Sequence, residues 1–363
     1  MTVYKFLGAK QFGEPRDVLK WGTLDTLPSV VNCAIEVLIR VAYVELNPVD
    51  LQKLKPHNKI GQVVPEDVLV TGYGGSGVVV VSPSSKNEEK QQRRFKDGDN
   101  VVFLADPRRP KGAYATHVVV DINCVSKIPI EISLEQAASL PLSGCTAYES
   151  LEKLSLSNNT NNSKKTTMKN LLIVGGAGGV GSWATLIARA LYPELEILTT
   201  ASSDMSRSWC RTMGSSRCLS GHDGSLLQQE LEGGRRGSID RILCLTEPTP
   251  ELWKALCEII RPFGVICLVV AGKSIANLDL GFLFFKSATV TTETVFSSQR
   301  TNYENGIVPS QEMDSMLKLL ADGSIPRTPL NKAVSWKEAL QDGGVLDQLA
   351  SGHNQGKMIM KID

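Results

Sequence analysis

Three glycines between two apolar runs could hold a negatively charged group. The run LLIVGGAGGVG (171–181) spaces them as G-x-G-x-x-G, directly before the helix-like WATLIARALY (183–192). Glycines at this spacing allow a tight turn from a strand into a helix, whose free N–H groups and positive dipole can bind a pyrophosphate. We therefore expect dinucleotide binding by Gly176, Ala177, Gly178, Gly179, Val180 and Gly181. The alternative is a glycine-rich turn without a ligand.

The residues after the next strand decide which dinucleotide the loop prefers. An acidic residue there binds the ribose 2′-hydroxyl of NAD and repels the 2′-phosphate of NADP. In this chain the strand ends instead in Ser202 and Ser203, and Arg207 and Arg211 follow within two helical turns. Hydroxyl and guanidinium groups suit a phosphate, so we expect NADPH. The alternative is that both arginines are only exposed helix residues close to Asp204.

The second half of the chain has the pattern of a parallel sheet that could position these loops. From Asn170 onward, apolar strands alternate with amphipathic helices, and further strands are expected at 239–246 and 264–272. This alternation predicts an α/β fold with a doubly wound parallel sheet. Such sheets bind ligands at the carboxyl ends of their strands, so we expect Thr246 and Ala271 at the cofactor site.

The first third of the chain has a different pattern. Short Val-rich runs separated by Gly and Pro predict a mainly β, partly open barrel-like domain, and they lie at 33–48, 76–83, 99–107 and 112–121. A helix-like segment follows at 133–154. Two polar tracts, 84–99 and 156–170, are expected to be surface loops or insertions.

Composition narrows the class of protein. At roughly 150 residues per domain, 363 residues suggest two domains. The 39 Lys and Arg nearly balance the 38 Asp and Glu, so the basic field that nucleic-acid binding needs is missing. No apolar run approaches the roughly 20 residues that span a bilayer, and the N-terminus lacks a signal-peptide core, so we expect a cytoplasmic protein. The eight cysteines are dispersed and are expected to be buried free thiols.

Several short motifs occur in an order that resembles one superfamily over almost the whole chain. Besides the glycine loop, they are N-P-V-D (47–50), G-x-x-x-S-G-V-V (72–79), F-K-x-G-D-x-V (95–101), G-A-Y-A (112–115) and a terminal S-G-H followed by G-K (351–357). This order resembles the medium-chain dehydrogenase/reductase superfamily. Its zinc-free quinone oxidoreductase branch is the most similar, particularly the proteins called zinc-type alcohol dehydrogenase-like.

The resemblance implies a split domain arrangement. Residues 1–130 and 290–363 would form a GroES-like catalytic domain, and residues 131–289 a Rossmann dinucleotide-binding domain. The active site would lie in the cleft between them. The family commonly forms dimers through the edge of the cofactor-domain sheet, so a homodimer through the apolar segment 264–285 is expected.

The resemblance also predicts that no zinc is bound. Zinc-using members have a metal-binding Cys where this chain has Asn47, a His-Glu pair where it has Tyr73-Gly74, and another Cys near Leu142. These residues cannot supply the three protein donors of a catalytic zinc site. Without this Lewis acid, alcohol oxidation is hard to explain. Hydride transfer from NADPH to a quinone or an α,β-unsaturated carbonyl remains feasible.

Individual roles follow from the same resemblance. Asn47 is expected beside the nicotinamide, its alternative being a turn residue before Pro48. Tyr73 stands where a zinc ligand is missing and could donate to a substrate carbonyl, although packing against the cofactor domain is the stronger alternative. Thr146 and Lys357 resemble residues near the cofactor. The alternative for Thr146 is helix capping or core packing, and the alternative for Lys357 is an exposed lysine.

Three departures from the family leave substrate and cofactor open. Gly74 replaces a common Asp, Ser203 stands near a common Lys or Arg, and Gln52 replaces a Lys of enone-reducing relatives. They motivate an alternative function, an NADPH-binding protein with little turnover and a structural or regulatory role. A small-molecule acceptor is the expected partner in the leading interpretation, with neither nucleic acid nor membrane.

Overall fold

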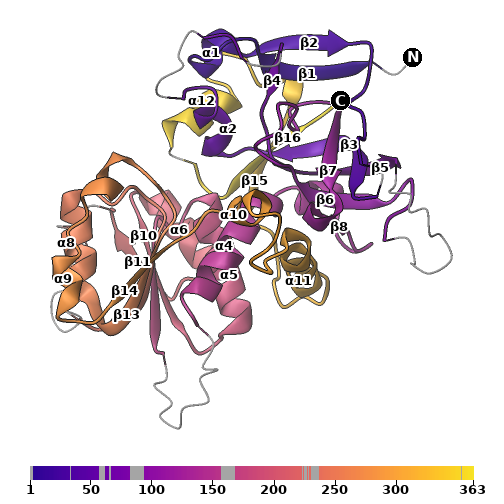
Figure 1. Cartoon of the computed structure of the whole chain (residues 1–363). Helices are drawn as coiled ribbons and strands as arrows, with labels where there is room; N and C mark the ends of the chain where they lie inside the picture. The colour runs from indigo at the N-terminus through magenta and orange to yellow at the C-terminus, as the bar shows by residue number, and fades with distance from the viewer. Residues whose placement is uncertain are drawn as a thin grey trace. The chain divides into compact units, whose positions relative to one another are not determined.

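The structure of this protein is a computed structural model (Figure 1). It describes residues 3–32, 34–56, 62–64, 67–81, 94–156, 168–222, 224, 227, 229, 237–352 and 354–363. Most of the polar tracts 84–99 and 156–170 lies outside the described residues. The same holds for Cys33, His57 and His353.

Internal contacts divide the chain into two units. Unit 2 is Thr146–Val295, and unit 1 comprises Met1–Cys145 together with Phe296–Asp363. The expected dinucleotide-binding part began at residue 131, whereas the structure assigns 131–145 to unit 1. Within unit 1, the first turn of the helix that starts in this segment donates two backbone hydrogen bonds to Glu45.

Unit 2 contains a six-stranded sheet in which every strand is parallel to its neighbours. The spatial order is β11-β10-β9-β12-β13-β14, with β9 (Asn170–Val174), β10 (Glu196–Ala201), β11 (Arg217–Ser220), β12 (Ile239–Cys244), β13 (Ile260–Leu268) and β14 (Thr289–Thr292). The order reverses between β9 and β12, the point where doubly wound sheets bind ligands. The predicted doubly wound parallel sheet is confirmed, and the glycine loop follows β9 at this reversal.

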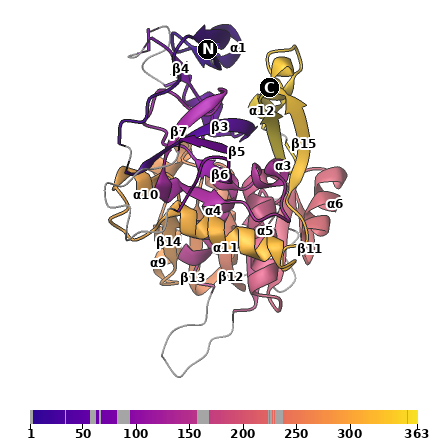
Figure 2. The ribbon, with the colours of Figure 1, turned by 90° about the vertical axis from the view of Figure 1, so that its right-hand side faces the viewer.

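Helices cover both faces of this sheet. They are α5 (Gly179–Leu191), α6 (Asp204–Met213), α8 (Pro250–Ile259), α9 (Gly281–Phe284) and the short η2 (Lys273–Asn277). Figure 1 shows α8 and α9 on one side of the strands and α5 on the other, and Figure 2 shows α6 beside β11. Because both faces are covered, strand residues such as Leu172, Ile242 and Ile266 are fully buried.

Unit 1 is built mainly from strands, as the sequence predicts. Its larger sheet has the order β15-β16-β3-β5-β6-β8, with β7 also paired to β3. These strands are β3 (Glu36–Glu45), β5 (Gly74–Val81), β6 (Asn100–Leu104), β7 (His117–Asp121), β8 (Val125–Lys127), β15 (Leu330–Ser335) and β16 (Lys357–Lys361). A smaller antiparallel sheet joins β2 (Lys20–Leu24), β1 (Tyr4–Ala9) and β4 (Leu69–Val70). The pairing of β16 with β3 places Ile359 opposite Glu45, so the end of the chain lies beside N-P-V-D.

Short helices complete unit 1. They are α1 (Pro15–Val18), α2 (Pro48–Gln52), α3 (Leu134–Ala137), α10 (Ser297–Arg300), α11 (Pro309–Ala321), α12 (Val345–Ser351), η1 (Ile122–Cys124) and η3 (Trp336–Glu338). The helix expected over 133–154 is two helices, because α4 (Pro141–Lys153) begins at a proline. Proline lacks the N–H that would continue α3 but suits a first helical position. α4 extends from unit 1 into unit 2.

Candidate active site

The glycine loop of unit 2 is held by two hydrogen bonds to the neighbouring strand β10. Gly175, at φ +85°, donates its N–H to Thr200 Oγ1 at 3.0 Å. Gly176 donates to the Thr200 carbonyl at 3.1 Å. Positive φ is readily adopted by glycine alone. The expected tight turn from strand to helix is therefore present.

Close backbone packing requires two of the motif glycines. A Cβ on Gly176 would lie 2.6 Å from Thr199 Cβ, and one on Gly181 would lie 2.6 Å from the Gly175 carbonyl oxygen. Gly178 differs, because the nearest atom to a Cβ there would be 3.7 Å away. Gly176 and Gly181 thus serve the fold of the loop, while Gly178 leaves open space through which a ligand could approach the backbone.

The start of α5 supplies donors for an anion. Gly178 is the N-cap residue, and Ser182 is the first residue whose N–H bonds back into the helix, to the Gly178 carbonyl at 2.9 Å. The first N–H groups of a helix lack intrahelical partners, so residues 179–181 present donors at its positive end. Ala177 is buried and packs with Cys210 beneath the loop. These residues fit the pyrophosphate of a dinucleotide.

The carboxyl end of β10 brings hydroxyls and a guanidinium together. Ser202 is exposed, and Ser203 caps α6 by accepting the N–H of Ser206 at 3.2 Å. Arg207 Nη2 lies 2.5 Å from Asp204 Oδ1. The Asp204 side chain is 99% exposed, so solvent screens this pair and it contributes little stability. The guanidinium could therefore turn toward a stronger anion such as a phosphate.

The remaining predicted cofactor residues of unit 2 lie at different depths. Thr246 follows β12 and is close to the glycine loop, since its Cγ2 is 3.2 Å from the position of a Cβ on Gly175. Ala271 is exposed after β13. Thr146 is buried in α4, where its carbonyl accepts the Ser150 hydroxyl at 2.7 Å. Contacts of these residues with a cofactor stay predictions.

In unit 1, Asn47 precedes α2 with its amide in a fixed orientation. Its Oδ1 accepts Lys357 Nζ at 2.7 Å and the Ser143 hydroxyl at 3.3 Å, and its Nδ2 donates to the Glu45 carbonyl at 3.4 Å. An ammonium group can only donate, so Lys357 determines which end of the amide is oxygen. Among the residues that the structure describes, the other N–H of this amide has no acceptor. Asn47 is therefore a buried, oriented donor.

The three partners of the Lys357 ammonium all belong to unit 1. Its Nζ donates to Asn47 Oδ1, to the Leu46 carbonyl at 2.9 Å and to Glu45 Oε1 at 2.8 Å. These contacts occupy all three ammonium donors. The alternative of an exposed lysine is wrong, because the residue is buried. A direct contact with the cofactor would need one of these bonds to break, and it stays a prediction.

Glu45 supplies a carboxylate beside Gly74. It accepts the backbone N–H groups of Leu142 at 2.8 Å and Ser143 at 3.1 Å. A Cβ on Gly74 would lie 2.4 Å from Glu45 Oε2, so a side chain at this position would collide with the carboxylate. Glycine at position 74, where the family commonly has Asp, therefore has a structural reason: Glu45 of β3 already occupies the space that a side chain at position 74 would need.

Tyr73 is completely buried, and its ring packs edge-on against Phe296 with centroids 5.5 Å apart. Its hydroxyl has no partner within the described part of the chain. Burial raises the pKa of Tyr73 well above its ordinary value of 10, so the hydroxyl remains a protonated donor. The ring partner Phe296 belongs to unit 1, so packing of Tyr73 against the cofactor domain stays a prediction, as does its catalytic role.

Asp50 is another buried group of unit 1 with an unsatisfied atom among the described residues. Its Oδ2 accepts the Asn47 N–H at 2.8 Å and the Tyr114 hydroxyl at 3.0 Å, while Oδ1 has no partner among the described residues. Burial raises the pKa of Asp50 from 3.8 to about 7, against the effect of both hydrogen bonds. A substantial fraction of this carboxyl group is therefore protonated at neutral pH, next to Asn47.

Four residues of these two regions were given no individual role by the sequence patterns. Asp50 was visible as the last residue of N-P-V-D, Tyr114 as the tyrosine of G-A-Y-A, and Glu45 as an acid at the end of an apolar strand. His222 carried no signal, and the long-range contacts of these residues could not be read from the sequence. His222 Nδ1 lies 2.6 Å from Thr200 Oγ1, the acceptor of the glycine loop.

The described residues contain neither a cluster that could hold a metal ion nor a helix that could span a membrane. Within the part of the chain that the structure covers, no three His, Cys, Asp or Glu side chains gather in a way that could hold a metal ion. No helix in that part is long and apolar enough to cross a membrane. The described cysteines are free thiols, and all except the half-buried Cys218 are buried, which confirms the expectation for these residues.

The chain is similar to known dehydrogenases and reductases in both sequence and fold. Residues 34–130 match the alcohol dehydrogenase GroES-like domain. A zinc-type alcohol dehydrogenase-like protein of Staphylococcus epidermidis is 34% identical over 264 residues, which are 72% of this chain and 71% of the relative. The 2-methylene-furan-3-one reductase of Solanum lycopersicum is 31% identical over 50% of this chain and 46% of its own length. Among solved structures, the quinone oxidoreductase of Coxiella burnetii matches all of both chains with a TM-score of 0.76 at 20% identity.

Proposed function

The chain belongs to the medium-chain dehydrogenase/reductase superfamily, and we propose that it is an NADPH-dependent oxidoreductase that reduces a quinone or an α,β-unsaturated carbonyl without zinc. The observation that carries this proposal is the glycine loop after β9, with two sterically required glycines and free N–H groups at the start of α5. When bound there, a nicotinamide dinucleotide would supply the hydride. A cytoplasmic location is part of the proposal.

The preference for NADPH rests on the end of β10. Ser202 and Ser203 stand where an NAD-selective acid would bind the ribose. Among the described residues, Arg207 is paired with one carboxylate, that of the exposed Asp204. If the Arg207 guanidinium released Asp204 and bound the 2′-phosphate of NADPH, its ion-pair partner would carry a higher charge. These contacts support NADPH over NADH.

The absence of zinc from the proposal rests on the donor chemistry of unit 1. The positions that resemble zinc ligands hold Asn47, Tyr73, Gly74 and Leu142, and the Asn47 oxygen already accepts the Lys357 ammonium at 2.7 Å. Zinc needs three donor side chains and is repelled by a neighbouring cation. These residues do not fit the metal, so no step is assigned to it.

The choice of acceptor rests on two buried donors. Asn47 offers an N–H and Tyr73 a hydroxyl, and both could hydrogen-bond to the oxygen that becomes negative when a quinone or enone takes up hydride. Reaching Tyr73, which is fully buried, requires the substrate to displace part of its surroundings. The names of the tomato and Coxiella relatives describe reduction of such acceptors by those proteins, which supports the same class here.

The test is a titration of the purified chain with NADPH and NADH, followed by turnover assays with a small quinone and a short enone, each with and without a metal chelator. We expect tighter binding of NADPH and turnover that resists the chelator. Tighter binding of NADH would refute the cofactor assignment. Activity that is lost in the chelator and restored by zinc would refute the metal-free mechanism.

A second candidate function is NADPH binding with little turnover. The complete burial of Tyr73 and near-complete burial of Asn47 favour it, because catalytic donors must reach the substrate. Binding of NADPH without oxidation of it by any quinone or enone would support this candidate. Saturable oxidation would exclude it.

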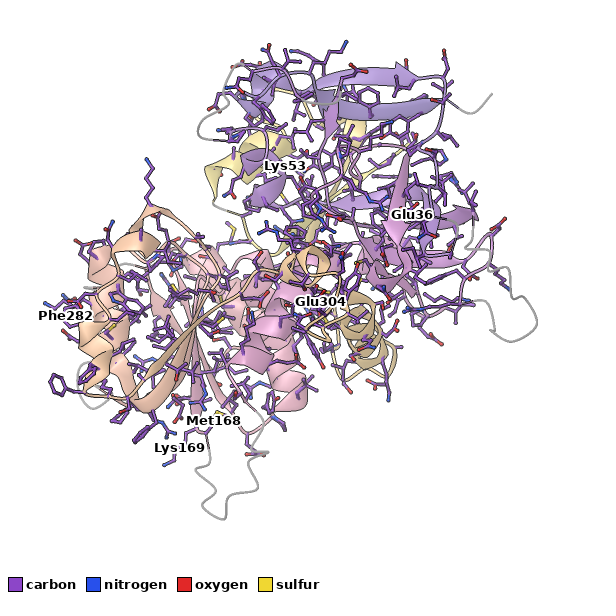
Figure 3. All side chains as sticks on the ribbon, in the orientation of Figure 1. Glu36, Lys53, Met168, Lys169, Phe282 and Glu304 are labelled. Atoms are coloured by element: carbon purple, nitrogen blue, oxygen red, sulfur yellow. The ribbon has the colours of Figure 1, made fainter. Side chains whose placement is uncertain are left out.

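We also propose that the chain forms a homodimer through the β14 edge of unit 2. Among the described strands, β14 pairs with β13 alone. Exposed apolar side chains lie on β13 at Phe263 and on or beside α9, the helix that precedes β14, at Leu280, Phe284 and Phe285. Figure 3 shows Phe282, also partly exposed, at the outer side of α9. An apolar patch of this kind is typical of a protein interface.

A further inference from the structure

Two cysteines of unit 2 pack in one small apolar cluster beside the glycine loop. Cys210, on α6, is fully buried and packs with Ala177 and Ala201, and Cys218, on β11, is half-buried against the same cluster. The register of the sheet places Cys218 directly opposite Thr199 of β10. Helix and strand therefore bring together two thiols that are eight positions apart in the sequence.

The electrostatic surroundings make the two thiols unequal. A hydrogen bond from the Cys210 thiol lowers the pKa of Cys218, and the charges of Arg211 and Arg207 lower it further. The same hydrogen bond raises the pKa of Cys210. By contrast, burial raises the pKa of Cys257, elsewhere in this unit, to about 12. Since the thiolate is the reactive form and Cys218 is half-buried whereas Cys210 is fully buried, Cys218 is the nucleophile of the pair.

We propose that Cys210 and Cys218 form an oxidation site at which a hydroperoxide converts the two thiols into a disulfide between α6 and β11. The sulfur of Cys218 attacks the peroxide, the O–O bond breaks, and a sulfenic acid and an alcohol or water result. The sulfur of Cys210 then displaces water from the sulfenic acid as the S–S bond forms. The two thiols lose two electrons and two protons in total, and the hydroperoxide is reduced.

Cys210 lies close enough to the glycine loop for oxidation of the pair to change the packing of the loop. Cys210 Sγ lies 3.4 Å from the position that a Cβ on Gly176 would take, so it is packed against the backbone of the loop. Drawing Cys210 into a bond with Cys218 changes this packing. We expect weaker dinucleotide binding after oxidation, a consequence that rests on the proposed function, whereas formation of the disulfide does not.

Peptide mapping tests the oxidation itself. The reduced full-length protein is treated with hydrogen peroxide, its remaining thiols are blocked in denaturant, and it is digested with trypsin. Cleavage after Arg207, Arg211 and Arg217 separates the two cysteines into peptides 208–211 and 218–235. We expect these two peptides to be joined, and the joining to disappear in Cys218→Ser.

Cys257 provides the internal control, because it is buried and burial raises its pKa. Peroxide should leave Cys257 a free thiol, so the blocking reagent should modify it. The proposal is overturned if Cys257 is oxidised as fast as Cys218. It is also overturned if peroxide leaves both thiols of the pair free, or takes Cys218 to sulfinic acid without joining the peptides.

An NADPH titration of the reduced and oxidised protein tests the consequence for the loop. Oxidation is expected to weaken binding by roughly fivefold or more, the lower range of measured couplings between sites. A thiol reductant should restore it, and Cys218→Ser should not respond to peroxide, whereas Cys257→Ser should respond like the wild type. Unchanged affinity after complete disulfide formation would overturn the coupling. Failure of the reduced protein to bind NADPH would count against the proposed function, and the peptide map would still decide the oxidation site.

Discussion

Replacing Asp50 by asparagine removes one ionisation from the buried polar cluster of unit 1 and should change how stability depends on pH. The pKa of Asp50 is about 7 in the folded protein, against an ordinary 3.8, because its carboxyl group is buried. Between these two values the folded chain binds more protons than the unfolded chain. The free energy of unfolding therefore falls as pH rises through this window.

The size of the effect follows from the same two values. Each pH unit within the window contributes about 1.4 kcal/mol. The gap between 3.8 and about 7 thus amounts to roughly 4 kcal/mol in total. Asparagine keeps an oxygen that can accept from the Asn47 N–H and the Tyr114 hydroxyl but carries no charge at any of these pH values.

Urea unfolding of both proteins across this range measures the difference directly. From about pH 5 to about pH 8, the wild type should lose roughly 3 kcal/mol of unfolding free energy relative to Asp50→Asn. Taking the difference removes the contributions of all other titrating groups. Asp342→Asn is the matched control, because it makes the same chemical change at a fully exposed side chain. A wild-type-minus-Asp50→Asn difference that is flat, or that rises with pH, would refute the assignment of a protonated buried carboxyl.

Four further changes test other parts of the structure. Gly176→Ala should lower the unfolding free energy by about 1–3 kcal/mol and abolish dinucleotide binding, because its Cβ would lie 2.6 Å from a threonine side chain. In the same assay, Gly178→Ala should keep the unfolding free energy of the wild type. Arg207→Ala should weaken NADPH binding by about tenfold and leave NADH binding unchanged, and equal losses for both cofactors would contradict a role at the 2′-phosphate. Lys357→Met leaves a carboxylate buried without its cation and should cost about 3–5 kcal/mol in urea unfolding, and a loss below 1 kcal/mol would be inconsistent with a buried ion pair. Phe285→Asp should convert the proposed dimer into a monomer in analytical ultracentrifugation without changing circular dichroism, and an unchanged mass would rule out an interface at this 95% exposed side chain.

The dinucleotide loop was predictable from the sequence because all its determinants are local. The strand before it, the glycines and the helix after it are consecutive, and glycine spacing reports directly on backbone geometry. The alternation of apolar strands and amphipathic helices likewise reflects burial of each element, so the doubly wound sheet could be predicted without knowing its strand order. Pro141 carried a local signal as well, yet its effect of dividing one helix into two was not anticipated.

Tertiary structure alone decided the chemistry around Asn47. Glu45 and Lys357 meet because β16 pairs with β3, and nothing in either segment specifies that pairing over a separation of 312 positions. The same contact orients the Asn47 amide and explains why residue 74 is glycine. Cys210 and Cys218 meet for a related reason, because α6 folds back onto the sheet beside β11. Sequence patterns record how each residue's own segment is buried, whereas the partner of a buried charge, amide or thiol depends on which distant segment packs against it.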